Sequence, residues 1–261
     1  MHWALLLSLS QAGGECPSVL RDAQSAFGER KLDTAISGFE RAISICPPKP
    51  EIHVTLGQLL FLGGREIEAE DRIKAALAID PRHAGALYAL GRLYYEQKRY
   101  IEGVGQFNKL TAIEPRNHKA WDNLGLCYDA LSRDSDALRS FFRALDLVMK
   151  AHPEYDWAHA NLADFFLRRE QYEKAFQLAA EAARRNPASS RNAFLTARAL
   201  AKLDKRDLSL RWLEQAVKLD GDYAEAWYVL AQTYRKLGRA DDAEKALVRF
   251  REANVKPKSR R

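Results

Sequence analysis

The sequence predicts an all-α protein built from repeated pairs of antiparallel helices. The chain has 261 residues, of which 47% are hydrophobic, and this is enough to bury a continuous core. Its wealth of Ala, Leu, Glu, Lys and Arg favours helix, and only nine prolines interrupt it. A pattern of 34 residues recurs from Cys16 almost to the end of the chain, which is typical of a repeat protein.

The pattern divides residues 16–257 into seven repeats. They begin at Cys16, Pro50, Ala84, His118, Asp156, Ser190 and Ala224. One insertion of four residues falls between Ala144 and Pro153. We expect it to lengthen the second helix of the fourth repeat by about one turn, roughly 6 Å, and to divide the stack into four N-terminal and three C-terminal repeats. Residues 1–15 precede the repeats as an apolar leader or signal peptide, and residues 258–261 form a basic tail.

Two positions of the repeat are small throughout. The eighth position holds Ala23, Gly57, Gly91, Gly125, Ala163, Ala197 and Ala231. The twentieth position holds Ala35, Ala69, Gly103, Ala137, Ala175, Ser209 and Ala243. Small side chains at both places allow the second helix of a repeat to cross the first at short distance. Five repeats close with a proline, which ends the second helix because proline lacks an amide donor.

The fourth repeat resembles the tetratricopeptide signature. The residues that carry the resemblance are Trp121, Leu124, Gly125, Tyr128, Ala137, Phe141 and Ala144. It extends over roughly residues 16–256, and the terminal repeats depart from it at Asp22, Phe250 and Val255. Membership of this family implies a right-handed superhelical solenoid, in which the first helix of each repeat lines a concave groove.

The resemblance also implies which side chains face the groove, namely those at positions 2, 5, 6, 9, 12 and 13 of each repeat. The candidate groove residues are Tyr88, Arg92, Tyr95, Asp122, Asn123, Asp129, Trp157, Asn161, Asp164, Arg168, Phe194, Arg198 and Tyr228. Aromatic side chains beside arginines and carboxylates are the mixture that protein interfaces favour. The alternative for each aromatic residue is that it packs against its neighbours.

Asn123 and Asn161 share the sixth position of adjacent repeats. They resemble, in part, the asparagine ladder of the protein O-linked N-acetylglucosamine transferases, whose amides bind a peptide backbone. By contrast, the lysine and asparagine that chaperone-binding members carry at positions five and nine are not found here. This disfavours the acidic C-terminus of a chaperone as the partner.

The predicted function is a non-enzymatic protein-interaction module or adaptor that binds an extended peptide or a helix of a partner protein. The alternative is a structural scaffold that self-assembles, or joins an envelope complex, through its end faces. Leu247 and Phe250 motivate this alternative, because they lie on a last helix that no polar capping helix follows.

The sequence shows none of the arrangements typical of an enzyme or a metal site. Its six histidines lack ligand spacing, and it has neither a glycine-rich phosphate loop nor a Ser-His-Asp or Cys-His arrangement. We therefore predict no catalysis, no metal and no cofactor. The formal charge of +6 includes four charges in the terminal stretch, and elsewhere basic residues alternate with acidic ones. This disfavours nucleic acid as a partner.

Cys16 and Cys46 lie at opposite ends of the first predicted helix pair, so an antiparallel hairpin would bring them together. They form a disulfide candidate, and two unpaired thiols are the alternative. Pairing requires an oxidising compartment. The apolar run over residues 1–9 precedes Ser10-Gln11-Ala12, which has the form of a signal-peptidase site. We predict export to the periplasm or the cell exterior, with the cytoplasm as the alternative, and no transmembrane segment, since no apolar run is long enough.

Overall fold

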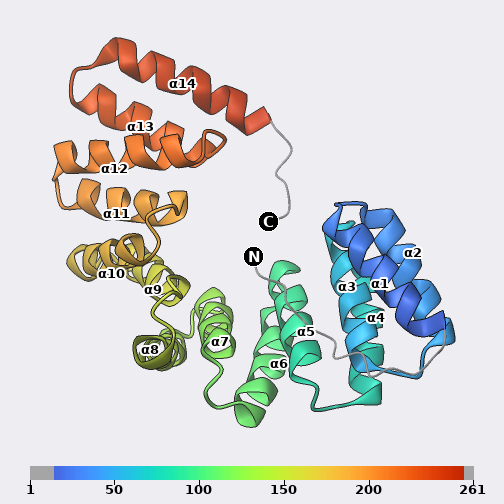
Figure 1. Ribbon diagram of the computed structural model, residues 1–261. Coiled ribbons are helices and arrows are strands. Elements are labelled where there is room, and N and C mark those ends of the chain that lie inside the picture. The colour runs from blue at the N-terminus through green and yellow to red at the C-terminus, as the bar shows by residue number, and fades with distance from the viewer. Residues whose placement is uncertain (1–14, 256–261) are drawn as a thin grey trace. The chain divides into compact units, whose positions relative to one another are not determined.

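The computed structural model describes residues 15–255, and over this range it contains fourteen α-helices and no strand. The helices alternate as first and second members of seven consecutive pairs (Figure 1). Their bounds are α1 Glu15–Gly28, α2 Leu32–Ile45, α3 Pro50–Leu62, α4 Glu66–Ile79, α5 Ala84–Glu96, α6 Tyr100–Ile113, α7 His118–Ala130, α8 Asp134–Ala151, α9 Trp157–Arg168, α10 Tyr172–Arg185, α11 Ser190–Lys202, α12 Arg206–Leu219, α13 Ala224–Lys236 and α14 Ala240–Val255. The predicted basic tail and residues 1–14 of the predicted leader lie outside the described residues.

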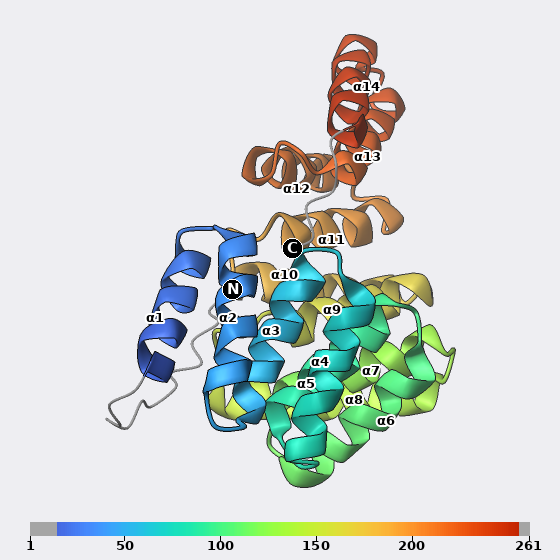
Figure 2. The ribbon, with the colours of Figure 1, turned by 90° about the vertical axis from the view of Figure 1, so that its right-hand side faces the viewer.

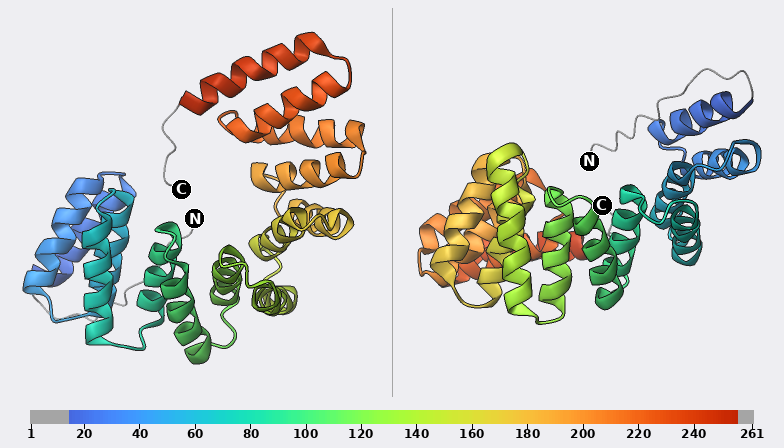
Figure 3. Two further views of the ribbon diagram at one scale, coloured as in Figure 1. Left: turned by 180° about the vertical axis from the view of Figure 1, so that it is seen from behind. Right: turned by 90° about the horizontal axis from the view of Figure 1, so that it is seen from below.

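The chain forms two compact units, residues 1–115 and residues 116–261. Unit 1 contains α1 to α6 (Figure 2), and unit 2 contains α7 to α14 (Figure 3). We had expected a division after the fourth repeat, at the insertion, but it falls after the third. The chain does not divide at the insertion because α8 contains the four inserted residues as additional helix. This helix has 18 residues where the other second helices have 14 or 16, and it still packs against both α7 and α9.

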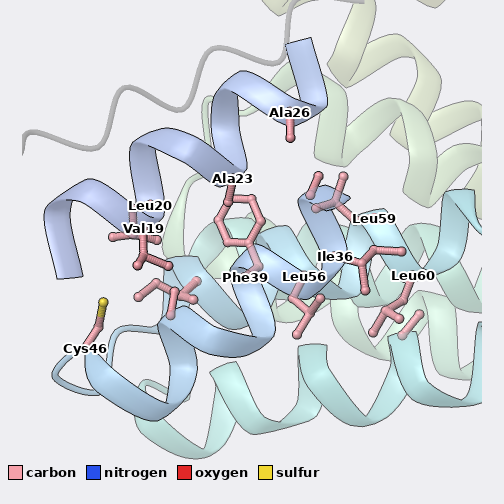
Figure 4. Packing of buried hydrophobic residues seen from close by; sticks show 14 residues of the cluster. Val19, Leu20, Ala23, Ala26, Ile36, Phe39, Cys46, Leu56, Leu59 and Leu60 are labelled. Carbon is pink, nitrogen blue, oxygen red and sulfur yellow. The ribbon is translucent and has the colours of Figure 1, made fainter. Parts of the chain in front are cut away.

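The helix pairs cross at the small residues, as the repeat predicted. A Cβ atom added to Gly125 would lie 2.6 Å from the Phe141 ring, and one added to Gly91 would lie 2.8 Å from the Phe107 ring. Both rings are fully buried. Figure 4 shows the corresponding core of unit 1, where side chains of α1, α2 and α3 meet around Phe39. A side chain of the second helix, Phe107 or Phe141 in these pairs and Ile73 against Gly57, thus fills the space that the small residue on the first helix leaves open.

Every turn within a helix pair contains one residue with positive φ, and it lies at the fifteenth position of each repeat. These residues are Arg30, Gly64, Lys98, Ser132, Glu170, Asp204 and Gly238. The next residue donates its amide back into the end of the first helix, as Lys31 does to the carbonyl of Ala26 and Arg65 does to that of Leu60. This left-handed cap usually selects glycine, but only two of the seven turns have one, so sequence inspection alone missed the motif.

Cys16 and Cys46 form a disulfide with a Cα–Cα distance of 5.1 Å. The bond joins the first turn of α1 to the residue that follows α2. The helix hairpin thus brings together the two cysteines that were predicted as a disulfide candidate. Cys127 is a buried free thiol on α7, and burial raises its pKa to about 12. None of the helices between residues 15 and 255 combines the length and apolarity that a membrane span needs.

Candidate functional site

A chain of alternating charges crosses the first helices of unit 2. The carboxylate of Asp129 on α7 is buried and accepts a hydrogen bond from Arg168 Nη2 at 2.6 Å. Arg169 Nη1 lies 3.0 Å from its other oxygen. Arg168 also lies 3.2 Å from the carboxylate of Asp164, which pairs in turn with Arg198 on α11 at 3.4 Å. Asp129 therefore links α7 to α9, and Asp164 links α9 to α11.

A second, buried network connects the same helices at their other ends. Asp122 Oδ2 accepts hydrogen bonds from Tyr155 Oη and from Asn161 Nδ2, both at 2.9 Å. The Asn161 carbonyl accepts a hydrogen bond from Arg191 Nη2 at 2.9 Å. Tyr155 belongs to the connection between α8 and α9, which is the segment that follows the insertion. The network therefore fixes the joint between the fourth, fifth and sixth repeats.

The predicted asparagine ladder is not formed. Asn123 and Asn161 are only 6% and 3% exposed. The amide nitrogen of Asn123 donates to the Lys119 carbonyl at 2.8 Å, and the amide of Asn161 binds Asp122 and Arg191. These amides bind groups of the chain itself, so they do not project from the surface toward a peptide. The same correction applies to the exposure expected of Asp122, Asp129 and Phe194, which are all buried.

Side chains that are exposed or partly buried define a surface that we call the first-helix face of unit 2. It consists of Trp157, Asp164, Arg168, Arg191, Arg198 and Tyr228. Trp157 is 51% exposed, and the Arg191 guanidinium lies 4.9 Å from the centroid of its ring. Arg198 lies over Phe194, whose ring contacts that of Tyr223 at 4.9 Å. Two arginines of α11 thus lie over aromatic rings, Arg191 over a ring of the preceding repeat and Arg198 over a ring of its own repeat, which is an attractive and orienting contact.

Tyr223 reports the charges around this face. Burial raises the pKa of its hydroxyl to about 12. The carboxylates of Glu225 and Asp164 contribute to this raised pKa, while Arg191 and Arg198 oppose it. Both arginines and both carboxylates therefore lie within electrostatic reach of one phenol. Arg191 and Tyr223 did not appear among the sequence-predicted residues, although Arg191 occupies position 2 of its repeat, a groove position in the family pattern. Its contact with Trp157 joins two repeats, and the pattern within one repeat does not reveal that pairing.

The remaining predicted residues lie in unit 1, on α5. Tyr88 and Tyr95 are partly buried, and their rings contact those of Phe107 and Tyr100 at 6.0 and 5.5 Å. Arg92 is exposed and pairs with Glu96 at 3.4 Å. The packing alternative for groove aromatics thus describes these two tyrosines better than free exposure does.

On the last helix, the two side chains that motivated the scaffold hypothesis are covered in part. Leu247 and Phe250 are both partly buried, and the Phe250 ring contacts that of Tyr228 at 5.3 Å. Exposed positions on α14 include charged residues such as Glu244 and Arg251, and also Val248 and Val255. End-to-end assembly through this helix stays a hypothesis. Within residues 15–255, no cluster of three or more His, Cys, Asp or Glu side chains has the arrangement of a metal site.

Comparison with known protein families agrees with the helix pairs and their packing. A tetratricopeptide repeat model matches residues 64–127 and 207–260, and a second model with the same description matches residues 120–151. The chain belongs to the tetratricopeptide repeat family. Together the matches span more than half of the chain, in both units. No curated protein sequence matched.

Several solved structures share the fold at low sequence identity. A tetratricopeptide repeat protein from Parabacteroides merdae is 15% identical, with a TM-score of 0.74 over 93% of this chain and 94% of that one. PilW, described as a type IV pilus biogenesis factor, is 16% identical, with a TM-score of 0.70 over 80% of this chain and 96% of that one. YrrB, described as having an unusual peptide-binding site, is 20% identical, with a TM-score of 0.51 over 73% of this chain and 96% of that one. At these identities the likeness concerns the fold alone.

Proposed function

We propose that this protein is a non-enzymatic adaptor that binds a partner protein through the first-helix face of unit 2. Tetratricopeptide repeats generally mediate protein interactions. The observation that carries the proposal is the pairing of half-exposed Trp157 with Arg191, since exposed aromatics beside arginine are the usual centres of protein interfaces. The peptide-binding site named for YrrB supports the same mode of action.

The experiment compares capture of partners by matched variants. Trp157 and Phe142 are each 51% exposed, but they lie on a first and a second helix of unit 2. We expect Trp157→Ala to lose partners that the wild-type chain captures by cross-linking in cell extract, whereas Phe142→Ala should keep them. If Phe142→Ala loses the partners and Trp157→Ala keeps them, the second helices form the binding surface. If both variants keep all partners, this part of the proposal is wrong.

We further propose that the protein functions in an oxidising compartment after export. The disulfide between Cys16 and Cys46 supports this, because such bonds persist outside the reducing cytosol. The chain has three cysteines. Thiol titration of denatured protein, purified from its native compartment without reductant, should find Cys127 alone. Three reactive thiols would contradict the proposal.

A further inference from the structure

We infer that the first-helix face of unit 2 recognises an acidic peptide segment, and that Arg191, stacked on Trp157, binds a carboxylate of that segment beside an apolar side chain. This inference rests on the proposed function and adds the chemistry of the partner. It follows from which charges of the face are already paired and which are not.

Two carboxylates on the first helices of this region already form ion pairs with arginines of the same chain. Asp129 pairs with Arg168 and Arg169, and Asp164 pairs with Arg168 and Arg198. Four basic side chains on α11 and α13, by contrast, form no ion pair within 4.0 Å of a described residue. They are Arg191, Lys202, Arg235 and Lys236. These two first helices therefore carry positive charge, including that of Arg191 on the face, which an acidic ligand would neutralise.

Arg191 is held in place more firmly than the other three. One of its amino groups donates to Asn161, which is itself fixed by Asp122, and its guanidinium lies over the Trp157 ring. The side chain is partly buried, whereas Lys202, Arg235 and Lys236 are exposed. A guanidinium has several donors in a rigid plane, so the donors that Asn161 does not use remain available to a carboxylate. Preorganisation of this kind lowers the entropic cost of binding.

Trp157 determines what lies beside the acidic group. Its exposed surface adjoins the Arg191 guanidinium, so an aliphatic or aromatic side chain next to the bound carboxylate would cover the ring. We therefore expect the preferred motif to place an apolar residue close to Asp or Glu.

A carboxylate of the face makes a continuous polyanion a poorer ligand. Asp164 lies 3.2 Å from Arg168 and 3.4 Å from Arg198. A nucleic-acid backbone would place phosphates close to this carboxylate, while a peptide with a discrete acidic residue would not.

The test uses short random peptides displayed on phage and selected on the full chain. We expect enriched sequences with Asp or Glu close to an apolar residue. A synthetic copy of the most enriched peptide should bind about 10- to 100-fold more weakly to Arg191→Gln, measured by fluorescence anisotropy, and equally more weakly when its acidic residue is changed to the amide. Arg211→Gln is the matched control, since it removes an exposed, unpaired charge from α12 of the same repeat.

Each alternative outcome identifies what is wrong. Enriched peptides without acidic residues, or equal binding to Arg191→Gln and the wild-type chain, overturn acidic recognition but leave peptide binding intact. Tighter binding of a short oligoadenylate RNA, lost in Arg191→Gln, overturns the inference in favour of nucleic acid. Failure to enrich any peptide overturns the inference, while capture of partners by the Trp157→Ala and Phe142→Ala variants tests the proposed function separately. Should circular dichroism show that Arg191→Gln is unfolded, Arg191→Glu with a lysine-substituted peptide gives a second test, because restored binding supports the contact and absent rescue in a folded variant contradicts it.

Discussion

The role assigned to Asp129 can be tested by removing its carboxylate. Its side chain is only 4% exposed and meets Arg168 at 2.6 Å and Arg169 at 3.0 Å. Breaking a buried ion pair by removing one partner typically costs about 3 to 5 kcal/mol. Both arginines keep a second carboxylate, Asp164 and Asp134 respectively, and Arg168 is partly exposed, so neither becomes a buried unpaired charge. We therefore expect Asp129→Ala to cost less than that range, and to lower the free energy of unfolding by about 1.5 to 3 kcal/mol, the contribution of a hydrogen bond to a charged group.

Urea unfolding followed by far-ultraviolet circular dichroism measures this difference, and Asp134→Ala is the control. Asp134 also pairs with Arg169, but its side chain is 52% exposed. An exposed ion pair contributes less than about 1 kcal/mol, so the control should remain close to wild type. If the two variants differ by less than about 1 kcal/mol, solvent screens Asp129 as well. The description of Asp129 as a structural link between α7 and α9 would then be wrong.

Three further predictions concern the disulfide, a buried histidine and the close helix crossings. Changing Cys16 and Cys46 to serine should lower the free energy of unfolding by about 3 to 4 kcal/mol, because the disulfide closes a loop of 30 residues. If adding a reductant leaves the thermal midpoint of the wild-type protein unchanged, this prediction is wrong. Burial lowers the pKa of His159 to about 4, so the folded state favours the neutral imidazole. The free energy of unfolding therefore has its full value above the unfolded pKa of about 6.5 and falls as the pH is lowered toward 4. About 2 kcal/mol of it is lost at pH 5. His159→Leu should therefore flatten the pH dependence of the urea midpoint, and an unchanged slope would refute the assignment. Gly125→Ala should cost about 1 to 3 kcal/mol through overlap with an aromatic ring, whereas Gly105→Ala, with no atom within 4 Å, should be neutral or stabilising; equal thermal shifts would argue against the close crossing.

The fold was predictable because the repeat places the same physical requirement at the same position seven times. Gly91 and Gly125 lie against aromatic rings of the second helix, and such contacts leave a clear record in the sequence. The extended α8 was predictable too, since four added residues between helix-compatible segments can only lengthen or interrupt a helix. The division into two units was not, because it depends on the packing between whole repeats rather than on residues within one.

The site was harder to predict, because the position of a residue in the repeat shows where its side chain starts and does not show which other side chain it binds. Asn161 and Asp122 both occupy positions that face the groove in the family pattern, yet they bind each other at 2.9 Å and are buried. The Tyr155 hydroxyl that completes their network comes from a connection that the repeat pattern does not describe. Likewise, Arg191 gains its importance from Trp157 in the preceding repeat. Polar side chains can satisfy one another across repeats, and a one-dimensional pattern does not show which of them do.

The chain of charges through Asp129, Arg168, Asp164 and Arg198 also bears on how unit 2 opens. In a linear array, stability is approximately the sum of each repeat's own contribution and a coupling energy with its neighbour. This chain adds to the coupling at two successive joints, α7 with α9 and α9 with α11. The seventh helix pair is joined to the sixth by apolar packing, in which Leu213 and Val217 of α12 share a core with Leu230 of α13, and not by an extension of this chain of charges. Amide hydrogens of the fourth, fifth and sixth pairs should consequently exchange as one cooperative block, whose last member carries Arg191.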